Sequence, residues 1–87
     1  MMAGMDKHIA TLRAIFRKPV RPIRYGDIES LFLSLGFAVT EGAGSRVRFV
    51  SPKKEVFALH RPHPSNELGK DAVRSIRRFL ESVGIAP

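Results

Sequence analysis

The spacing of apolar residues changes twice along this chain, and that change restricts the fold more than any other feature. Over residues 6–19, 25–36 and 71–84, apolar side chains recur every three or four positions, which is the period of an amphipathic helix. Between residues 37 and 60 they recur at every second position, as in a strand with one buried face. The sequence therefore predicts a small α+β domain in which helices precede and follow a segment of short strands and cover one face of the sheet that these strands form.

Three helices are predicted, each with its own start and stop signals. In the first, Asp6 is expected to cap the start, and an extended linker, "VRPIR" (20–24), follows the stop at Lys18 and Pro19. Gly36 and Gly84 are expected to end the other two. The apolar stripes consist of Ile9, Leu12, Ile15 and Phe16; of Ile28, Leu31, Phe32 and Leu35; and of Val73, Ile76, Leu80 and Val83.

Three short strands are predicted between the second and third helices. They read "FAVTE" (37–41), "RVRFV" (46–50) and "EVFALH" (55–60), and the turns "GAGS" and "SPKK" separate them. We expect positive φ at Gly42 and Gly44 in the first turn. The result is a three-stranded antiparallel meander and the order α-α-β-β-β-α, in which residues 1–24, an N-terminal helix and linker, precede a domain over residues 25–87.

Strand alternation assigns the charged residues of this sheet to one face. If Val47 and Phe49 point into the core, Arg46 and Arg48 point to the opposite, open face. On the next strand Phe57 and Leu59 are the expected core pair. This places Val56, Ala58 and His60 on the same open face as the two arginines.

The segment "HRPHP" (60–64) brings two histidines close together. Its two prolines favour a polyproline-like course with three residues per turn, which would put His60 and His63 on one side about 9 Å apart. Histidine is suited to accept a proton from a ribose 2′-hydroxyl and return one to a leaving 5′-oxygen near neutral pH. A histidine beside prolines is more often a surface group or a phosphate donor, and two ligands alone make a metal site improbable.

The charge balance points to an anionic partner. The chain of 87 residues has 15 Lys and Arg against 8 Asp and Glu, a formal net charge of +7, which attracts phosphates or acidic proteins. Lys70, Arg74 and Arg78 on the last helix form either a solvated face or a phosphate-contacting stripe. Tyr25 is the one aromatic expected to be exposed, so stacking on single-stranded RNA is not expected.

Other features exclude several classes of protein. The absence of cysteine rules out disulfides and thiolate metal sites. No run approaches the roughly 20 apolar residues of a membrane span, and the N-terminus lacks the apolar segment of a signal peptide. We therefore expect a cytoplasmic protein without a membrane partner.

Several of these features occur together in a known family. The order helix, three strands, helix, with Gly44-Ser45 opening the second strand, "RPHP" after the third and a closing "GKDAVRSIRRFLESVGI", resembles the HicA toxins of bacterial HicA–HicB toxin–antitoxin pairs. The resemblance spans about Tyr25 to Ile85 and is strongest to a longer, basic subgroup with an N-terminal helix. It implies a fold like the double-stranded-RNA-binding domain, cleavage of messenger RNA (mRNA) that inhibits translation, and a HicB-like antitoxin partner.

The chain departs from the family where the chemistry is expected. HicA toxins usually carry a catalytic histidine at the first or second position after the Gly-Ser pair, and here those positions are Arg46 and Val47. Arginine stays protonated, although it can stabilise charge on a phosphorane. Either His60 or His63 has taken over proton transfer, or the domain binds RNA without cutting it.

The sequence thus predicts a metal-independent, cofactor-free mRNA endoribonuclease toxin. The candidate catalytic residues are His60, His63 and Arg46, and the candidate RNA contacts are Ser45, Arg46, Arg48, Arg61, Lys70 and Arg74. Two alternatives remain: a non-catalytic RNA-binding domain of the same fold, and a module whose basic face docks an acidic protein.

Overall fold

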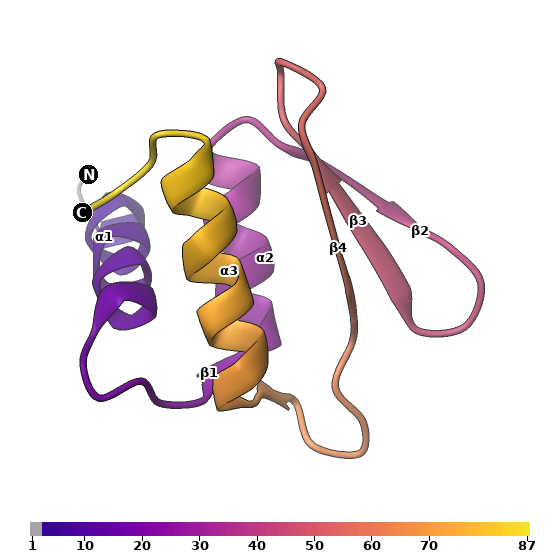
Figure 1. Ribbon diagram of the computed structural model, residues 1–87, viewed down its shortest axis with the longest axis horizontal. Coiled ribbons are helices and arrows are strands. Elements are labelled where there is room, and N and C mark those ends of the chain that lie inside the picture. Colours follow the sequence, from indigo (N-terminus) through magenta and orange to yellow (C-terminus); the bar gives the residue numbers. More distant parts are fainter. Residues whose placement is uncertain (1–2) are drawn as a thin grey trace.

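The structure of the chain is a computed structural model that describes residues 3–87, with side chains from residue 7 onward. It has three helices, α1 (Ala3–Phe16), α2 (Tyr25–Ser34) and α3 (Lys70–Ser82). Three strands, β2 (Ala38–Glu41), β3 (Arg46–Val50) and β4 (Val56–His60), form an antiparallel sheet in the order β2-β3-β4. This confirms the α+β class, the meander and the element order. Figure 1 shows the helices gathered on one side of the sheet and the other side open.

The helix boundaries follow the predicted signals with one exception. The second and third helices end just before Gly36 and Gly84, as predicted. The first helix begins at Ala3, three residues before Asp6, so the prediction that Asp6 caps its start is wrong. Helical residues continue N-terminal to the aspartate because nothing in residues 3–6, which contain no proline, interrupts a helix.

Two very short strands, which no sequence pattern predicted, pair the linker with the segment before α3. β1 (Ile23–Arg24) pairs antiparallel with β5 (Glu67–Leu68), with Ile23 opposite Leu68. Both of these apolar side chains are buried. The amide of Tyr25 also donates a hydrogen bond of 2.8 Å to the carbonyl of Asn66. Two residues per strand are too few for a periodic pattern, so the pairing depends on tertiary packing.

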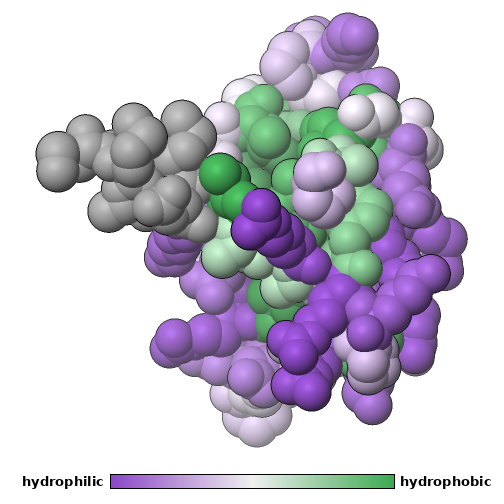
Figure 2. All heavy atoms as spheres, turned by 90° about the vertical axis from the view of Figure 1, so that its left-hand side faces the viewer, coloured by the Kyte–Doolittle hydropathy of each residue, from purple (hydrophilic) through white to green (hydrophobic). Residues whose placement is uncertain are grey.

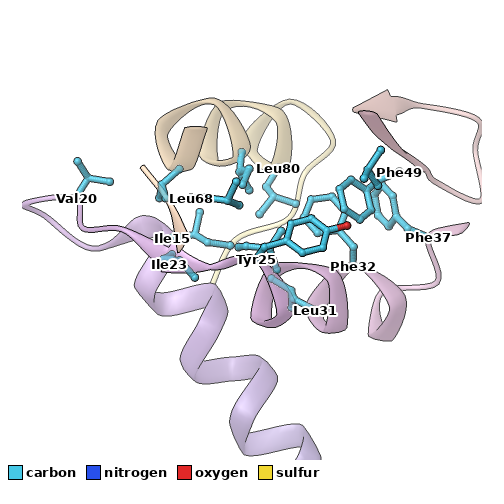
Figure 3. Close-up of a cluster of buried hydrophobic side chains, with 14 residues drawn as sticks. Ile15, Val20, Ile23, Tyr25, Leu31, Phe32, Phe37, Phe49, Leu68 and Leu80 are labelled. Atoms are coloured by element: carbon cyan, nitrogen blue, oxygen red, sulfur yellow. The ribbon is translucent and has the colours of Figure 1, made fainter. Parts of the chain in front are cut away.

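The core lies between the helices and the inner face of the sheet. Phe32 of α2 is fully buried at its centre, with ring centroids 4.9 Å from Phe37 and 4.6 Å from Phe49 of β3. Figure 3 shows Ile15, Phe32, Phe49 and Leu80 converging from all three helices and β3. Burial of each such side chain contributes about 1.5–3 kcal/mol. Because Ile15 is fully buried, α1 is part of the same core.

Candidate functional site

The register of the sheet brings Arg46 and His60 together on the open face. Arg46 of β3 lies directly opposite His60 of β4, and both side chains are exposed. Val47 and Phe49, which alternate with the exposed arginines along β3, are fully buried, so the predicted parity of the strand is confirmed. Arg48, also exposed, lies between Thr40 of β2 and Ala58 of β4. One end of the open face is therefore basic and polar.

A residue of the turn before β3, Ser45, forms a hydrogen bond with His60 of this pair. The hydroxyl of Ser45 lies 3.2 Å from Nδ1 of His60. When the Nδ1–H donates to the Ser45 oxygen, the lone pair of Nε2 is free to accept a proton from a ligand. The backbone turn is set by Gly44, whose φ is +64°, whereas Gly42 has no positive φ, contrary to prediction. Gly42 does not need that conformation because it continues the ladder, donating its amide to the Arg46 carbonyl at 2.9 Å.

These residues line a shallow depression on the sheet. Its walls come from Arg46, Ala58, Leu59 and His60, and its volume is about 240 Å³. His63 does not line it; it lies in a bend over residues 63–66. The predicted spacing of about 9 Å between His60 and His63 therefore stays a prediction.

Arg61 has structural partners on three segments. Its guanidinium forms an ion pair with Glu41 at the end of β2 and stacks over the Tyr25 ring, 5.5 Å from the ring centroid. Its amide donates to the Ser45 carbonyl at 2.8 Å. These contacts hold the end of β4 against the turn that carries Ser45. Glu41 and Arg61 lie far apart in the sequence and belong to no common pattern, so this ion pair was not predicted from the sequence.

The electrostatics of Glu41, Arg61 and Tyr25 reflect their contacts. The hydrogen bond and charge of Arg61 lower the pKa of Glu41, and the same pair raises the pKa of Arg61. Burial is the main cause of the raised pKa of Tyr25. The prediction that Tyr25 is exposed is wrong, because the residue is only 8% exposed. It is the first residue of α2, and its ring lies in the core beneath Arg61.

The remaining predicted RNA contacts lie on the helical side of the sheet. Lys70 is the first residue of α3 and is exposed. Arg74, one turn later, forms an ion pair of 2.9 Å with Asp71. The structure thus unites Ser45, Arg46, Arg48 and His60 on one surface and separates Lys70 and Arg74 from them. Within residues 3–87, no group of three His, Cys, Asp or Glu could hold one metal ion, and no helix there is long and apolar enough to cross a membrane.

The fold and surface define a class of protein. Helices pack on one face of a three-stranded antiparallel sheet and leave the other face open, which is the arrangement of double-stranded-RNA-binding-type α+β domains. Residues 25–85 match the family model described as "HicA toxin of bacterial toxin-antitoxin", so the chain belongs to the HicA toxin family, and membership implies an antitoxin partner. No curated protein and no solved structure matches the chain significantly.

Proposed function

We propose that this chain is a toxin that cleaves mRNA in the cytoplasm as a metal-independent endoribonuclease, inhibits translation, and is neutralised by a HicB-like antitoxin. Family membership supports the toxin role. The observation that carries the nuclease role is the exposed pairing of Arg46 with His60, whose Nδ1 is hydrogen-bonded to Ser45. A proton acceptor and a fixed positive charge on one open surface are the groups that transesterification of RNA requires.

The chemistry follows from the roles of these groups. Nε2 of His60 takes the proton of a ribose 2′-hydroxyl as the 2′-oxygen attacks the adjacent phosphorus. The bond from phosphorus to the 5′-oxygen breaks, leaving a 2′,3′-cyclic phosphate, and the departing oxygen takes a proton from His63 or from water. The guanidinium of Arg46 stabilises the extra negative charge on the phosphorane, and Arg48 holds a neighbouring phosphate.

A second candidate is a non-catalytic RNA-binding domain. It is favoured by Arg46, which stands at a position where HicA toxins usually have histidine and which cannot act as a base. In that case His60 donates a hydrogen bond to phosphate and the open face binds RNA without cleaving it.

The experiment that decides between them offers mixed mRNA to the purified protein in the presence of a chelator. We expect cleavage without metal that leaves 2′,3′-cyclic phosphate or 3′-phosphate ends. His60→Ala should reduce the rate by about 10²-fold or more, the usual effect of losing a positioned base. His63→Ala should reduce it similarly if His63 is the acid, and only slightly if His63 contacts phosphate. His8→Gln, a change on α1, is the matched histidine control.

Arg46→His adds a second arm, because it restores the residue type usual in the family. A large gain in cleavage would mean that the natural protein is a weakened nuclease. No gain, together with a strong dependence on His60, would place the base on β4. If the protein binds RNA but cuts nothing, and its expression leaves growth unaffected, the RNA-binding alternative replaces the toxin.

A further inference from the structure

Two adjacent hollows lie between α3 and the linker that follows α1. The first, of about 250 Å³, is lined by Lys18, Pro19, Val20, Lys70, Arg74 and Arg77. The second, of about 330 Å³, is lined by Phe16, Lys18, Arg77, Arg78 and Glu81. Lys18 and Arg77 line both, so the hollows form one continuous surface. Figure 2 looks onto this helical side and shows hydrophilic side chains gathered over its lower part.

The fold fixes the position of Lys18 beside α3. Val20, two residues later, is buried, and β1 follows at Ile23 in its pairing with β5. β5 ends at Leu68, one residue before the N-cap of α3 at Gly69. The linker and the start of α3 are therefore held together by backbone pairing and by apolar burial. Lys18 thereby adds a further positive charge beside the basic residues of α3. It lies outside residues 25–85, the part of the chain that matches the family.

The cations of this surface are largely uncompensated. Among the described side chains, Lys18, Lys70, Arg77 and Arg78 form no ion pair, whereas Arg74 pairs with Asp71. Glu81 is the one carboxylate that lines either hollow. No side chain caps the N-terminus of α3 at Gly69, so its partial positive charge adds to the field around Lys70. Like charges that line the same hollows favour an anionic ligand.

We propose that Lys18, Lys70, Arg74, Arg77 and Arg78 form a second phosphate-binding surface that holds the RNA backbone. The proposal rests on the proposed function only in naming RNA as the ligand. Positions 70, 74 and 78 follow one another at about 6 Å along the helix, close to the spacing of successive phosphates in a nucleic-acid strand. The end of β4, the linker and the start of α3 lie at the same end of the molecule (Figure 1). RNA leaving the depression at His60 can therefore continue toward this surface.

The composition of the surface favours nucleic acid over an acidic protein. Interfaces with nucleic acid are polar and strongly positive, whereas the cores of protein interfaces are apolar and depleted of charge. Five of the residues that line the two hollows are Lys or Arg, and Val20 beneath them is buried. The N-terminal extension then has a function besides core packing, because its linker completes the phosphate site.

The test measures the affinity of a 12-nucleotide single-stranded RNA at several salt concentrations, in the His60→Ala background so that cleavage is slow. Lys18→Ala and Arg77→Ala should each weaken binding by about 3- to 10-fold and reduce the salt slope by about one. Lys53→Ala removes the same charge from the turn between β3 and β4 and should change the affinity by less than about twofold. Melting temperatures verify folding, and Lys18→Glu replaces Arg77→Ala if the latter does not fold.

The outcomes separate this site from the proposed function. If Lys18→Ala and Arg77→Ala bind like Lys53→Ala while Arg46→Ala binds weakly, the second surface is overturned and RNA binding at the sheet stands. If the parent binds no RNA, both are overturned. If the parent binds poly-glutamate instead, and the Lys18 and Arg77 variants lose that binding, the surface docks an acidic protein and not RNA.

Discussion

The hydroxyl oxygen of Ser45 lies 3.2 Å from Nδ1 of His60, across the turn that opens β3 and the end of β4. This bond orients the imidazole, and when the Nδ1–H is the donor it leaves Nε2 free to accept a proton. Ser45→Ala should therefore lower the cleavage rate by up to about tenfold, the contribution of one net hydrogen bond, and by less than His60→Ala. Single-turnover cleavage of an RNA oligonucleotide measures this difference.

Ser45→Thr is the matched control for that variant, because it keeps the hydroxyl. It should retain most of the activity, and its melting temperature should match that of Ser45→Ala. Equal rates for Ser45→Ala and the parent would mean that His60 needs no orienting bond from Ser45.

The domain should stay folded when an arginine on the open face of the sheet is removed. It should not stay folded when a charge is placed on the inner face. Arg46→Ala and Arg48→Ala should each weaken RNA binding and lower the salt slope by about one while the protein stays folded. Val47, between them, is fully buried, so Val47→Asp should cost on the order of 3–5 kcal/mol and unfold the domain. Circular dichroism and an RNA titration distinguish these results. A folded Val47→Asp protein would contradict the register of β3.

Gly44 adopts φ +64°, a conformation that β-branched residues resist. Gly44→Val should therefore destabilise the domain by about 1–3 kcal/mol, although a Cβ there meets no atom within 4 Å. Denaturant unfolding measures the free energy. Gly26→Ala in α2 is the control: the Cβ again has open space, and the change should stabilise the helix by about 0.5–1 kcal/mol. If Gly44→Val unfolds at the same denaturant midpoint as the parent, there is no strain in this turn.

The ion pair of Glu41 with Arg61 should make stability depend on acidic pH. Because Arg61 lowers the pKa of Glu41 below its ordinary value of 4.5 in the folded protein, the pair contributes fully above that value. The contribution is lost as the pH falls through the lower, folded-state pKa. Glu41→Gln should therefore reduce stability slightly at neutral pH and flatten the loss below about pH 5. Thermal melts of both proteins between pH 7 and pH 3 test this, and parallel curves would contradict it.

The sequence by itself determined the elements and their faces. Periods of 3.6 and 2 are local properties of the backbone, so the stripes through Phe32 and Ile76 and the alternation around Val47 predict helices, strands and the exposure of Arg46. The same alternation placed His60 on the same face as Arg46, because neighbouring strands of a hairpin share a face when both inner faces are apolar, and the register of the structure sets the two residues opposite each other.

Only the tertiary structure decided which distant side chains meet. The pairing of Glu41 with Arg61, the burial of Tyr25 beneath that pair, and the position of Lys18 beside Arg77 depend on how helices and strands pack. Isolated polar residues do not recur at a regular spacing, so no sequence pattern predicts which of them will meet. The two-residue strands β1 and β5 are likewise too short to have one, yet their pairing holds the linker beside α3. Contacts between segments far apart in the chain are set by the burial of shared apolar surface, which is a property of the whole fold.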